Sequence, residues 1–516
     1  MSCVDGNSGN GRRSENKSGA TPLATDPNDI LLGKGDEPVF LRARYGNRHG
    51  LTAGATGTGK TVSLLLIAEG FSRIGVPVVM ADVKGDVAGL AMPGVVNEKI
   101  RDRAVRVGLT DYRPEASPVV FWDVYGTAGH PLRAAVSEVG PTLMARMLEL
   151  NDTQTGVLEI SFKLADDRGL LLLDLDDLRA LLTFVAENRK DVSTQYGLVS
   201  PSSIAAVQRA LLTLEREGGD QFFGEPALEL PDLLGTDLTG RGIISILAAD
   251  KLIEKPRLYS SVLLWLVSEL FENLPEIGDS EKPRMVCILD EAHLLFSDAP
   301  PTLRRQIDQV VRLIRSKGVG VYFCSQFPDD VPNEILGQLG NRIQHALRAY
   351  TPRDQKAVRT AAETFVANPS LDVAQVIAEL GIGEALVSTL QDNAVPMPVQ
   401  RTLMAPPRCR IGTLTPDERA AVRGRSTIGA RYDAPLNRES AYEILGRKVG
   451  EQKSASGPPP RPERAQNSGA VHDWLWGTTR RQGMVEAMAK QAARTVGSQI
   501  GRQILRGVLG GIGRSR

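Results

Sequence analysis

A glycine-rich segment near the start of the chain has the residue types and spacing of a phosphate-binding loop. Residues 54–61 (GATGTGKT) fit the pattern G-x-x-x-x-G-K-[ST] at every fixed position. Glycines let such a backbone fold tightly, so that its N–H groups point at phosphate oxygens. We expect Lys60 to neutralise the β- and γ-phosphates of ATP and the Thr61 hydroxyl to bind Mg²⁺. The expected ATP-binding residues are Gly54, Ala55, Thr56, Gly57, Thr58, Gly59, Lys60 and Thr61.

A pair of acidic residues follows an apolar run much later in the chain. Residues 285–289 (MVCIL) lead directly into Asp290 and Glu291, which is a Walker B pattern. Asp290 would hold Mg²⁺, directly or through water, and Glu291 would orient and polarise the attacking water. The next two residues, ending in His293, complete the letters D-E-A-H of one helicase superfamily. We disfavour that superfamily because 230 residues separate Lys60 from Asp290 and no Ser-Ala-Thr motif follows, so His293 is expected to be only a polar contact.

Three more side chains are candidates for contact with the γ-phosphate. Gln326 follows an apolar run at 319–324 and would sense that phosphate from the tip of a strand, although it could simply cap the strand. Arg315 is the first candidate, and Arg48 the second, for an arginine that a neighbouring subunit supplies to stabilise the charge of phosphoryl transfer. The alternative for each arginine is a solvated side chain that touches no phosphate.

A short segment of mixed charge follows the strand expected at 76–81. Asp82 and Asp86 flank Lys84 in this segment. These side chains could line the nucleotide pocket or a subunit interface. A loop with a purely structural role is the alternative.

The elements that must position these residues follow a pattern of alternating strands and helices. This alternation predicts an α/β fold of the RecA-like P-loop type, with a mostly parallel sheet and helices on both faces. Apolar runs predict strands at 39–41, 51–53, 76–81, 242–247, 285–289, 319–324 and 343–349. Helical periodicity is found at 61–73, 132–149, 155–164, 203–217, 257–273 and 301–317.

Changes in composition divide the chain into expected units. The units are a disordered tail at 1–27, an ATPase core at 28–90 and 240–400, a largely helical insertion at 91–239, a C-terminal extension of the core at 401–452, a Pro/Ser/Gly linker at 453–470 and a basic amphipathic helical tail at 471–516. We expect the last unit to dock on a neighbouring subunit, with an anionic membrane surface or nucleic-acid phosphates as alternatives.

The overall composition excludes several classes of protein. Lys plus Arg and Asp plus Glu both number 61, so the formal net charge is zero and a histone-like basic coat is excluded. The four cysteines show no C-x-x-C spacing, which argues against a zinc site or a disulfide scaffold and suits a reducing cytoplasm. No run of 18 apolar residues is present, so no membrane span is expected.

The motifs together resemble the HerA/FtsK branch of RecA-like ATPases, in particular bacterial proteins with a HerA-like C-terminal helicase domain. The segments that carry the resemblance are 47–61, 81–86, 289–294, 315–320, 340–348, 351–356 and 438–443. The resemblance implies a hexameric, Mg²⁺- and ATP-dependent motor that acts as a DNA translocase or helicase on double-stranded DNA. Too few residues precede the phosphate loop for the N-terminal β-barrel of HerA, which puts a nuclease partner in doubt.

A second class of function is compatible with the same motifs. An oligomeric ATPase or nucleotide switch could act on protein partners without moving DNA. The candidates for DNA contact, Lys251, Lys255 and Arg257, could equally be solvated surface charges. No motif reads bases, so any DNA binding is expected to be independent of sequence.

Overall fold

The computed structural model describes residues 26–278, 280–296 and 301–447. The tail expected at 1–27 lies almost entirely outside this range, and the linker at 453–470 and the basic segment at 471–516 lie wholly outside it. Within the described ranges, none of the helices combines the length and the apolar character that crossing a membrane would require.

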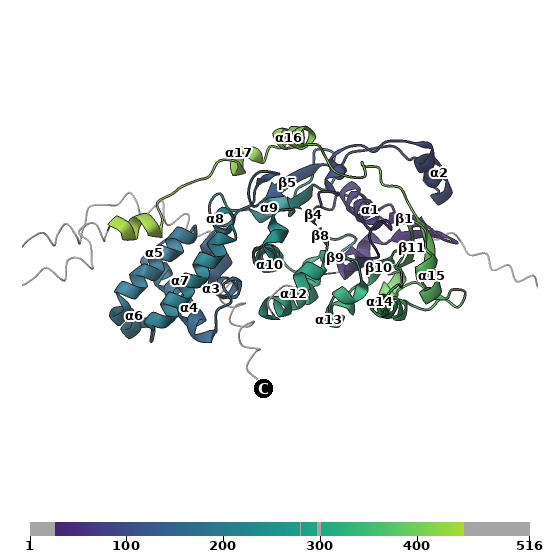
Figure 1. Cartoon of the computed structure of the whole chain (residues 1–516). Coiled ribbons are helices and arrows are strands. Elements are labelled where there is room, and N and C mark those ends of the chain that lie inside the picture. The colour runs from purple at the N-terminus through teal and green to yellow at the C-terminus, as the bar shows by residue number, and fades with distance from the viewer. Residues whose placement is uncertain (1–25, 279, 297–300, 448–516) are drawn as a thin grey trace, which may run out of the picture.

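A mixed sheet forms the centre of the described molecule (Figure 1). Its strand order is β2-β1-β12-β11-β10-β3-β9-β8-β4-β7-β5-β6. The strands from β10 to β6 are parallel, whereas β11, β12, β1 and β2 extend one edge in antiparallel orientation. The strands are β1 Ile30–Lys34, β2 Pro38–Leu41, β3 Gly50–Ala53, β4 Val78–Asp82, β5 Val119–Asp123, β6 His130–Pro131, β7 Ile244–Ala248, β8 Met285–Leu289, β9 Val319–Ser325, β10 Asn341–Gln344, β11 Glu384–Ser388 and β12 Gln400–Met404.

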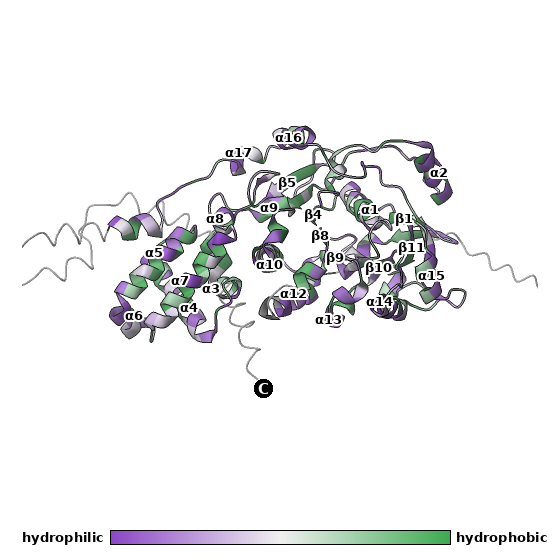
Figure 2. Ribbon diagram, in the orientation of Figure 1, coloured by the Kyte–Doolittle hydropathy of each residue, from purple (hydrophilic) through white to green (hydrophobic). Residues whose placement is uncertain are grey.

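Helices cover both faces of the sheet because its buried strands present apolar side chains in both directions. In β8, Val286 and Ile288 pack in one apolar cluster with α1, whereas Cys287 and Leu289 belong to a second cluster with α10 and α12. Figure 2 shows the hydrophilic residues concentrated on outer helices such as α2 and α16. The helices are α1 Lys60–Arg73, α2 Glu98–Val107, α3 Val136–Met147, α4 Asp152–Arg168, α5 Leu175–Glu187, α6 Arg189–Tyr196, α7 Pro201–Arg216, α8 Gly219–Phe222, α9 Leu230–Leu233, α10 Pro256–Asn273, α11 His293–Phe296, α12 Pro301–Ile314, α13 Asn333–Leu336, α14 Pro352–Glu363, α15 Val373–Glu379, α16 Pro416–Arg425 and α17 Gly429–Tyr432.

The predicted strands and helices of the core are confirmed except at one place. The strand predicted at 343–349 is wrong in its second half, because β10 ends at Gln344. His345 turns against the phosphate loop, with its N–H donating to Ala53 O at 2.7 Å. Leu347 then packs in a separate apolar cluster with α14 and α15. The apolar residues after β10 are therefore buried outside the sheet.

The segment 91–239 is helical for most of its length, and α3 to α7 lie to one side of the sheet (Figure 1). Side chains fix where three of these helices begin. Asn151, Asp174 and Ser200 each accept a hydrogen bond from the N–H three residues later, which starts α4, α5 and α7. The same segment contains β5, which pairs in parallel with β7, so part of it belongs to the central sheet.

The C-terminal strap, which we define as residues 405–447, joins the sheet to these helices. Its helices α16 and α17 cross the top of the molecule in Figure 1, and its end lies beside α5. Tyr432 of the strap is buried, with its ring edge-on to Trp122 of β5. The N–H of Tyr442 donates to the buried carboxylate of Asp177 in α5 at 2.8 Å. The strap thus contacts both the central sheet and the helices of 91–239.

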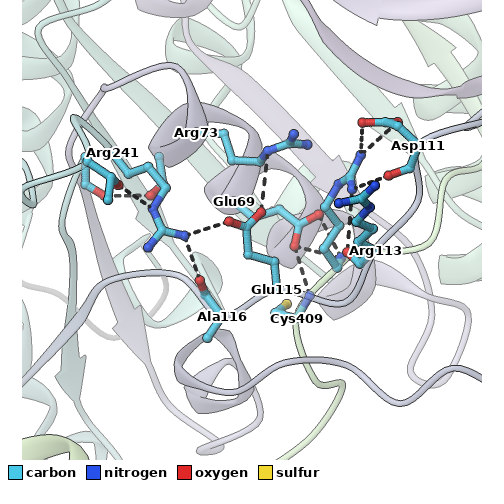
Figure 3. Close-up of polar contacts among 12 residues, drawn as sticks. Glu69, Arg73, Asp111, Arg113, Glu115, Ala116, Arg241 and Cys409 are labelled. Carbon is cyan, nitrogen blue, oxygen red and sulfur yellow. Dashed lines mark hydrogen bonds and ion pairs between the residues drawn. The ribbon is translucent and has the colours of Figure 1, made fainter.

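A buried carboxylate anchors the beginning of the strap (Figure 3). Glu69 of α1 accepts hydrogen bonds from the backbone N–H of Arg408 at 2.9 Å and of Cys409 at 3.2 Å. Burial raises the pKa of Glu69 to about 7 in spite of these hydrogen bonds. The Arg408 guanidinium is itself buried and bonds to both oxygens of Asp111 at 3.1 Å.

Candidate nucleotide-binding site

The phosphate loop leaves the carboxyl end of β3 and runs into α1, as the sequence predicts. The Gly54 N–H donates to Ser325 O of β9 at 3.3 Å. Gly54 has a φ of +151°, and a Cβ built there would lie 2.5 Å from Cβ of His345, so the position requires glycine. Helix α1 follows Gly59 without a side-chain cap. The N–H groups of its first turn are therefore available for phosphate oxygens.

Lys60 is buried against the loop that precedes it. Its Nζ donates to Gly54 O at 2.6 Å and to Ala55 O at 3.2 Å. The Thr58 hydroxyl also donates to Ala55 O, at 2.7 Å, and closes the loop from the other side. These contacts hold a positive charge at the centre of the loop, where it can meet the β- and γ-phosphates.

Asp290 and Glu291 directly follow β8, and both are buried. The Glu291 N–H donates to Asp290 Oδ1 at 2.9 Å. Burial, together with the neighbouring charge of Glu291, raises the pKa of Asp290. Glu291 has a φ of +49°, a backbone region that few residues other than glycine adopt and that is often found at functional sites.

Strand β9 connects the phosphate loop to this acidic pair. It lies between β3 and β8 in the sheet. Ser325 O accepts the Gly54 N–H at 3.3 Å, and the preceding residue, Cys324, accepts the Ala292 N–H on its carbonyl at 2.8 Å. Neighbouring strands lie about 4.8 Å apart, so the strands that end at the loop and at the acids are about 10 Å apart. A triphosphate with a metal ion can bridge a gap of this size.

Oxygen atoms suited to Mg²⁺ gather on the acidic side of the loop. Thr61 Oγ1 donates to Asp86 Oδ2 at 2.9 Å, while Asp86 Oδ1 is buried and has no hydrogen-bond partner among the described residues. Burial, reinforced by the charge of Asp86, raises the pKa of Asp82 to about 7. Mg²⁺ prefers such oxygens and usually takes one or two carboxylates together with substrate phosphates. The Thr61 hydroxyl and the neighbouring carboxylates are donors of this kind, so the residues present fit a Mg²⁺ ion.

The mixed-charge segment after β4 reaches the acidic pair. Lys84 forms an ion pair with Glu291 Oε1. Although burial alone would lower the pKa of Lys84, its contact with Glu291 and the charges of Asp290 and Asp86 raise it. His293, at the start of α11, has Nδ1 3.3 Å from Glu291 Oε2. His293 thus lies at a helix start beside the candidate base, and neither its Nδ1 nor Glu291 Oε2 makes a hydrogen bond within the described residues.

The remaining candidates lie at two different edges of the sheet. Gln326 is half-buried directly beyond β9, at the edge that carries the phosphate loop. Arg48 precedes β3 and Arg315 precedes β9, so both lie at the opposite edge, and both charges help to lower the pKa of the buried His49, after burial itself. Because β3 alone is about 13 Å long, neither arginine reaches the phosphate loop of its own chain.

His345 belongs to the site although the sequence assigns it no role there; it lies in the segment 340–348 that carries the family resemblance. Its Nε2 lies 2.9 Å from Ser63 Oγ in α1, and its Nδ1 lies 3.0 Å from Glu384 O at the start of β11. Burial lowers the pKa of His345 to about 4, so the ring is neutral at physiological pH. The neutral ring supports the back of the loop against Gly54.

A family model described as the C-terminal domain of HerA-like helicases matches residues 28–516. Curated relatives include the DNA double-strand break repair helicases HerA of Saccharolobus solfataricus, 30% identical over 104 residues, and of Sulfurisphaera tokodaii, 31% identical over 115 residues. These alignments cover 20% and 22% of this chain and 20% and 21% of the relatives. The chain thus spans about a quarter or less of the length of the curated relatives it matches.

Solved structures that align with the chain include a bacterial conjugative coupling protein and a VirB4 protein. The conjugative coupling protein TrwB aligns with a TM-score of 0.49 at 15% identity, over 74% of this chain and 90% of that chain. VirB4 of Thermoanaerobacter pseudethanolicus aligns with a TM-score of 0.45 at 16% identity, over 76% of this chain and 98% of that chain.

Proposed function

The chain belongs to the HerA-like C-terminal helicase family of RecA-like P-loop ATPases, and on that premise we propose that it is a Mg²⁺-dependent motor that hydrolyses ATP and moves along duplex DNA. One observation carries the proposal. The Gly54 N–H of the phosphate loop donates to Ser325 O of β9, and the N–H of Ala292, which follows the acidic pair, donates to Cys324 O of the same strand. The groups that bind a triphosphate and those that activate water are thereby held on one edge of the sheet.

The chemistry of the reaction follows from the chain's own side chains. Lys60 and the first turn of α1 bind and neutralise the phosphates. Thr61 and Asp290 would hold Mg²⁺, which neutralises charge on the phosphate oxygens. Glu291 accepts the proton of the attacking water, and Gln326 contacts the γ-phosphate from the tip of β9.

We assign this activity to the cytoplasm, because the described cysteines are buried free thiols.

The two candidate arginines support an oligomer, for which we propose a hexameric ring. Arg48 and Arg315 face the edge of the sheet away from their own phosphate loop, so they can contribute to hydrolysis only at a neighbouring subunit's site. Turnover per subunit should therefore fall several-fold when the protein is diluted below its assembly concentration. Steady-state ATPase assays across a dilution series, paired with size-exclusion light scattering, measure both quantities. Constant turnover by a species shown to be monomeric would contradict the proposed role of both arginines.

DNA is the substrate that we propose for this motor, contacted through a small number of basic side chains. Lys251 is exposed after β7 and donates to Thr127 Oγ1 at 3.2 Å, whereas Arg257 is in an ion pair with Glu149 at 2.9 Å, which makes Lys251 and Lys255 the better candidates. Turnover should rise several-fold with duplex DNA at about 50 mM salt and lose most of this stimulation at about 200 mM, because phosphate contacts release counterions. The stimulation should not depend on the DNA sequence.

The experiment compares ATP turnover with and without a random-sequence duplex at the two salt concentrations. A polyanion without bases, such as heparin, serves as the control for simple charge effects. Turnover that is unchanged by DNA at both salt concentrations would favour the alternative, an oligomeric ATPase or switch that acts on protein partners.

A further inference from the structure

The segment 82–86 contacts both catalytic halves of the nucleotide site at once. At one end, Asp86 accepts a hydrogen bond from the Thr61 hydroxyl at 2.9 Å. Two residues earlier, Lys84 forms its ion pair with Glu291. One short loop therefore connects the start of α1, where phosphate and metal bind, to the carboxylate that faces the attacking water.

This loop is well anchored at its base. Asp82 is 2% exposed, and its Oδ1 accepts the Gly85 N–H at 2.7 Å. The Asp82 carbonyl accepts the Ala249 N–H at 2.8 Å, just beyond the neighbouring strand β7. With its base fixed, the movable part of the loop is the side chain of Lys84, which is 46% exposed.

Both oxygens of the Glu291 carboxylate are closed to water in this arrangement. Its side chain is only 4% exposed, Lys84 occupies Oε1, and Oε2 is buried with no hydrogen-bond partner among the described residues, 3.3 Å from His293 Nδ1. A water molecule that is to give its proton to Glu291 needs one of these oxygens. Lys84 is 46% exposed and can leave Oε1, which would open that oxygen to water.

From this geometry we infer that Lys84 restrains Glu291 and releases it when a triphosphate is bound. The inference rests on the proposed function of the site. A γ-phosphate placed between Lys60 and the acids offers the Lys84 ammonium a competing anion with more charge than one carboxylate. Lys84 then moves from Glu291 to the phosphate, and Oε1 becomes free for water. A diphosphate offers no such anion at that position, so Lys84 returns to Glu291.

The segment 82–86 is also linked to the C-terminal strap. The charge of Arg419, in α16 of the strap, acts on the carboxyl of Asp82. The Arg419 guanidinium donates to Ala128 O at 3.0 Å and lies over the Phe121 ring of β5, 4.3 Å from its centroid. The strap joins these elements to the helices of 91–239, so a partner bound there has a contiguous path to the restraint.

The test replaces Lys84 with methionine, which keeps the length of the side chain and removes its charge. For Lys84→Met we expect the Kd for ATP to rise about fivefold, the loss that one half-exposed charged contact can supply, with the Kd for ADP changed less than about twofold. Lys84→Arg should restore most of the affinity for ATP, because its guanidinium can contact the same phosphate. Lys99→Met, an exposed lysine on α2, is the matched control and should change neither parameter.

A second measurement follows the loop directly in the wild-type protein. Amide hydrogen exchange in residues 82–86 should increase with Mg²⁺ and a non-hydrolysable ATP analogue and stay at the nucleotide-free rate with Mg²⁺ and ADP. Equal changes in the Kd values of Lys84→Met for ATP and ADP, or equal exchange with the two nucleotides, would overturn the restraint. Absence of any ATP turnover in the wild-type protein would instead overturn the proposed function, and the exchange data would still decide the role of Lys84.

Discussion

Glu291→Gln should bind ATP as tightly as the wild-type protein and hydrolyse it at least about 100-fold more slowly, because the loss of a general base costs 10²- to 10⁴-fold. Glutamine has the same length as glutamate, and its amide oxygen can still accept the hydrogen bond from Lys84. It cannot accept a proton from water at neutral pH. The variant therefore separates binding from chemistry, and single-turnover hydrolysis together with the Kd of a fluorescent ATP analogue measures the two.

The control for Glu291→Gln is the same substitution at an exposed glutamate far from the acidic pair. Glu276 follows α10 on the surface, and Glu276→Gln should leave both turnover and affinity unchanged. Rapid hydrolysis by Glu291→Gln would mean that another group activates the water. In that case the ion pair with Lys84 would serve the structure of the site and not its chemistry.

The two catalytic motifs could be predicted from the sequence because each is contiguous and each follows an apolar strand. The residues of the phosphate loop are neighbours along the chain, and so are Asp290 and Glu291. Their proximity in space could not be predicted in the same way. It depends on β9 lying between β3 and β8, an order set by packing among strands that are far apart in sequence.

The contacts that join the motifs could not be predicted for the same reason. Lys84 and Glu291 are 207 residues apart, and a segment with mixed charges allowed a pocket, an interface or a structural loop. His345 lies in a segment that carries the family resemblance, but nothing in the sequence assigns its side chain a role. The strand predicted at 343–349 runs across it and does not reveal the turn that brings its ring to Gly54.

In the insertion at 91–239, the sequence also carries the signal of a helix that lies outside the helices predicted above. Helix α5 places Leu175, Leu178, Leu182 and Val185 at helical spacing, and all four are buried. Asp174 before it is a typical N-cap. The helical spacing of its apolar residues is therefore sufficient to predict α5. The pairing of β5 with β7 could not be predicted, because a run of apolar residues does not reveal its partner strand.

Lys60 carries the largest single contribution that we expect to nucleotide binding. Its ammonium is buried and is held by Gly54 O and Ala55 O, so little reorganisation is needed when a triphosphate arrives. Truncating one partner of a buried, charge-assisted contact costs about 3 kcal/mol or more, which corresponds to more than about 100-fold in affinity.

Lys60→Ala should therefore lose more than about 100-fold in ATP affinity and have no turnover above background. The fold should persist, since Ala55 O keeps its hydrogen bond from the Thr58 hydroxyl and alanine favours the first turn of α1. Isothermal titration with ATP and Mg²⁺ measures the affinity, and circular dichroism with the thermal midpoint monitors the fold. Lys99→Ala, at an exposed position of α2, should match the wild-type protein in every measurement. If Lys60→Ala is folded and still hydrolyses ATP at the wild-type rate, the triphosphate does not lie against this loop, and the acidic pair after β8 cannot be acting on it.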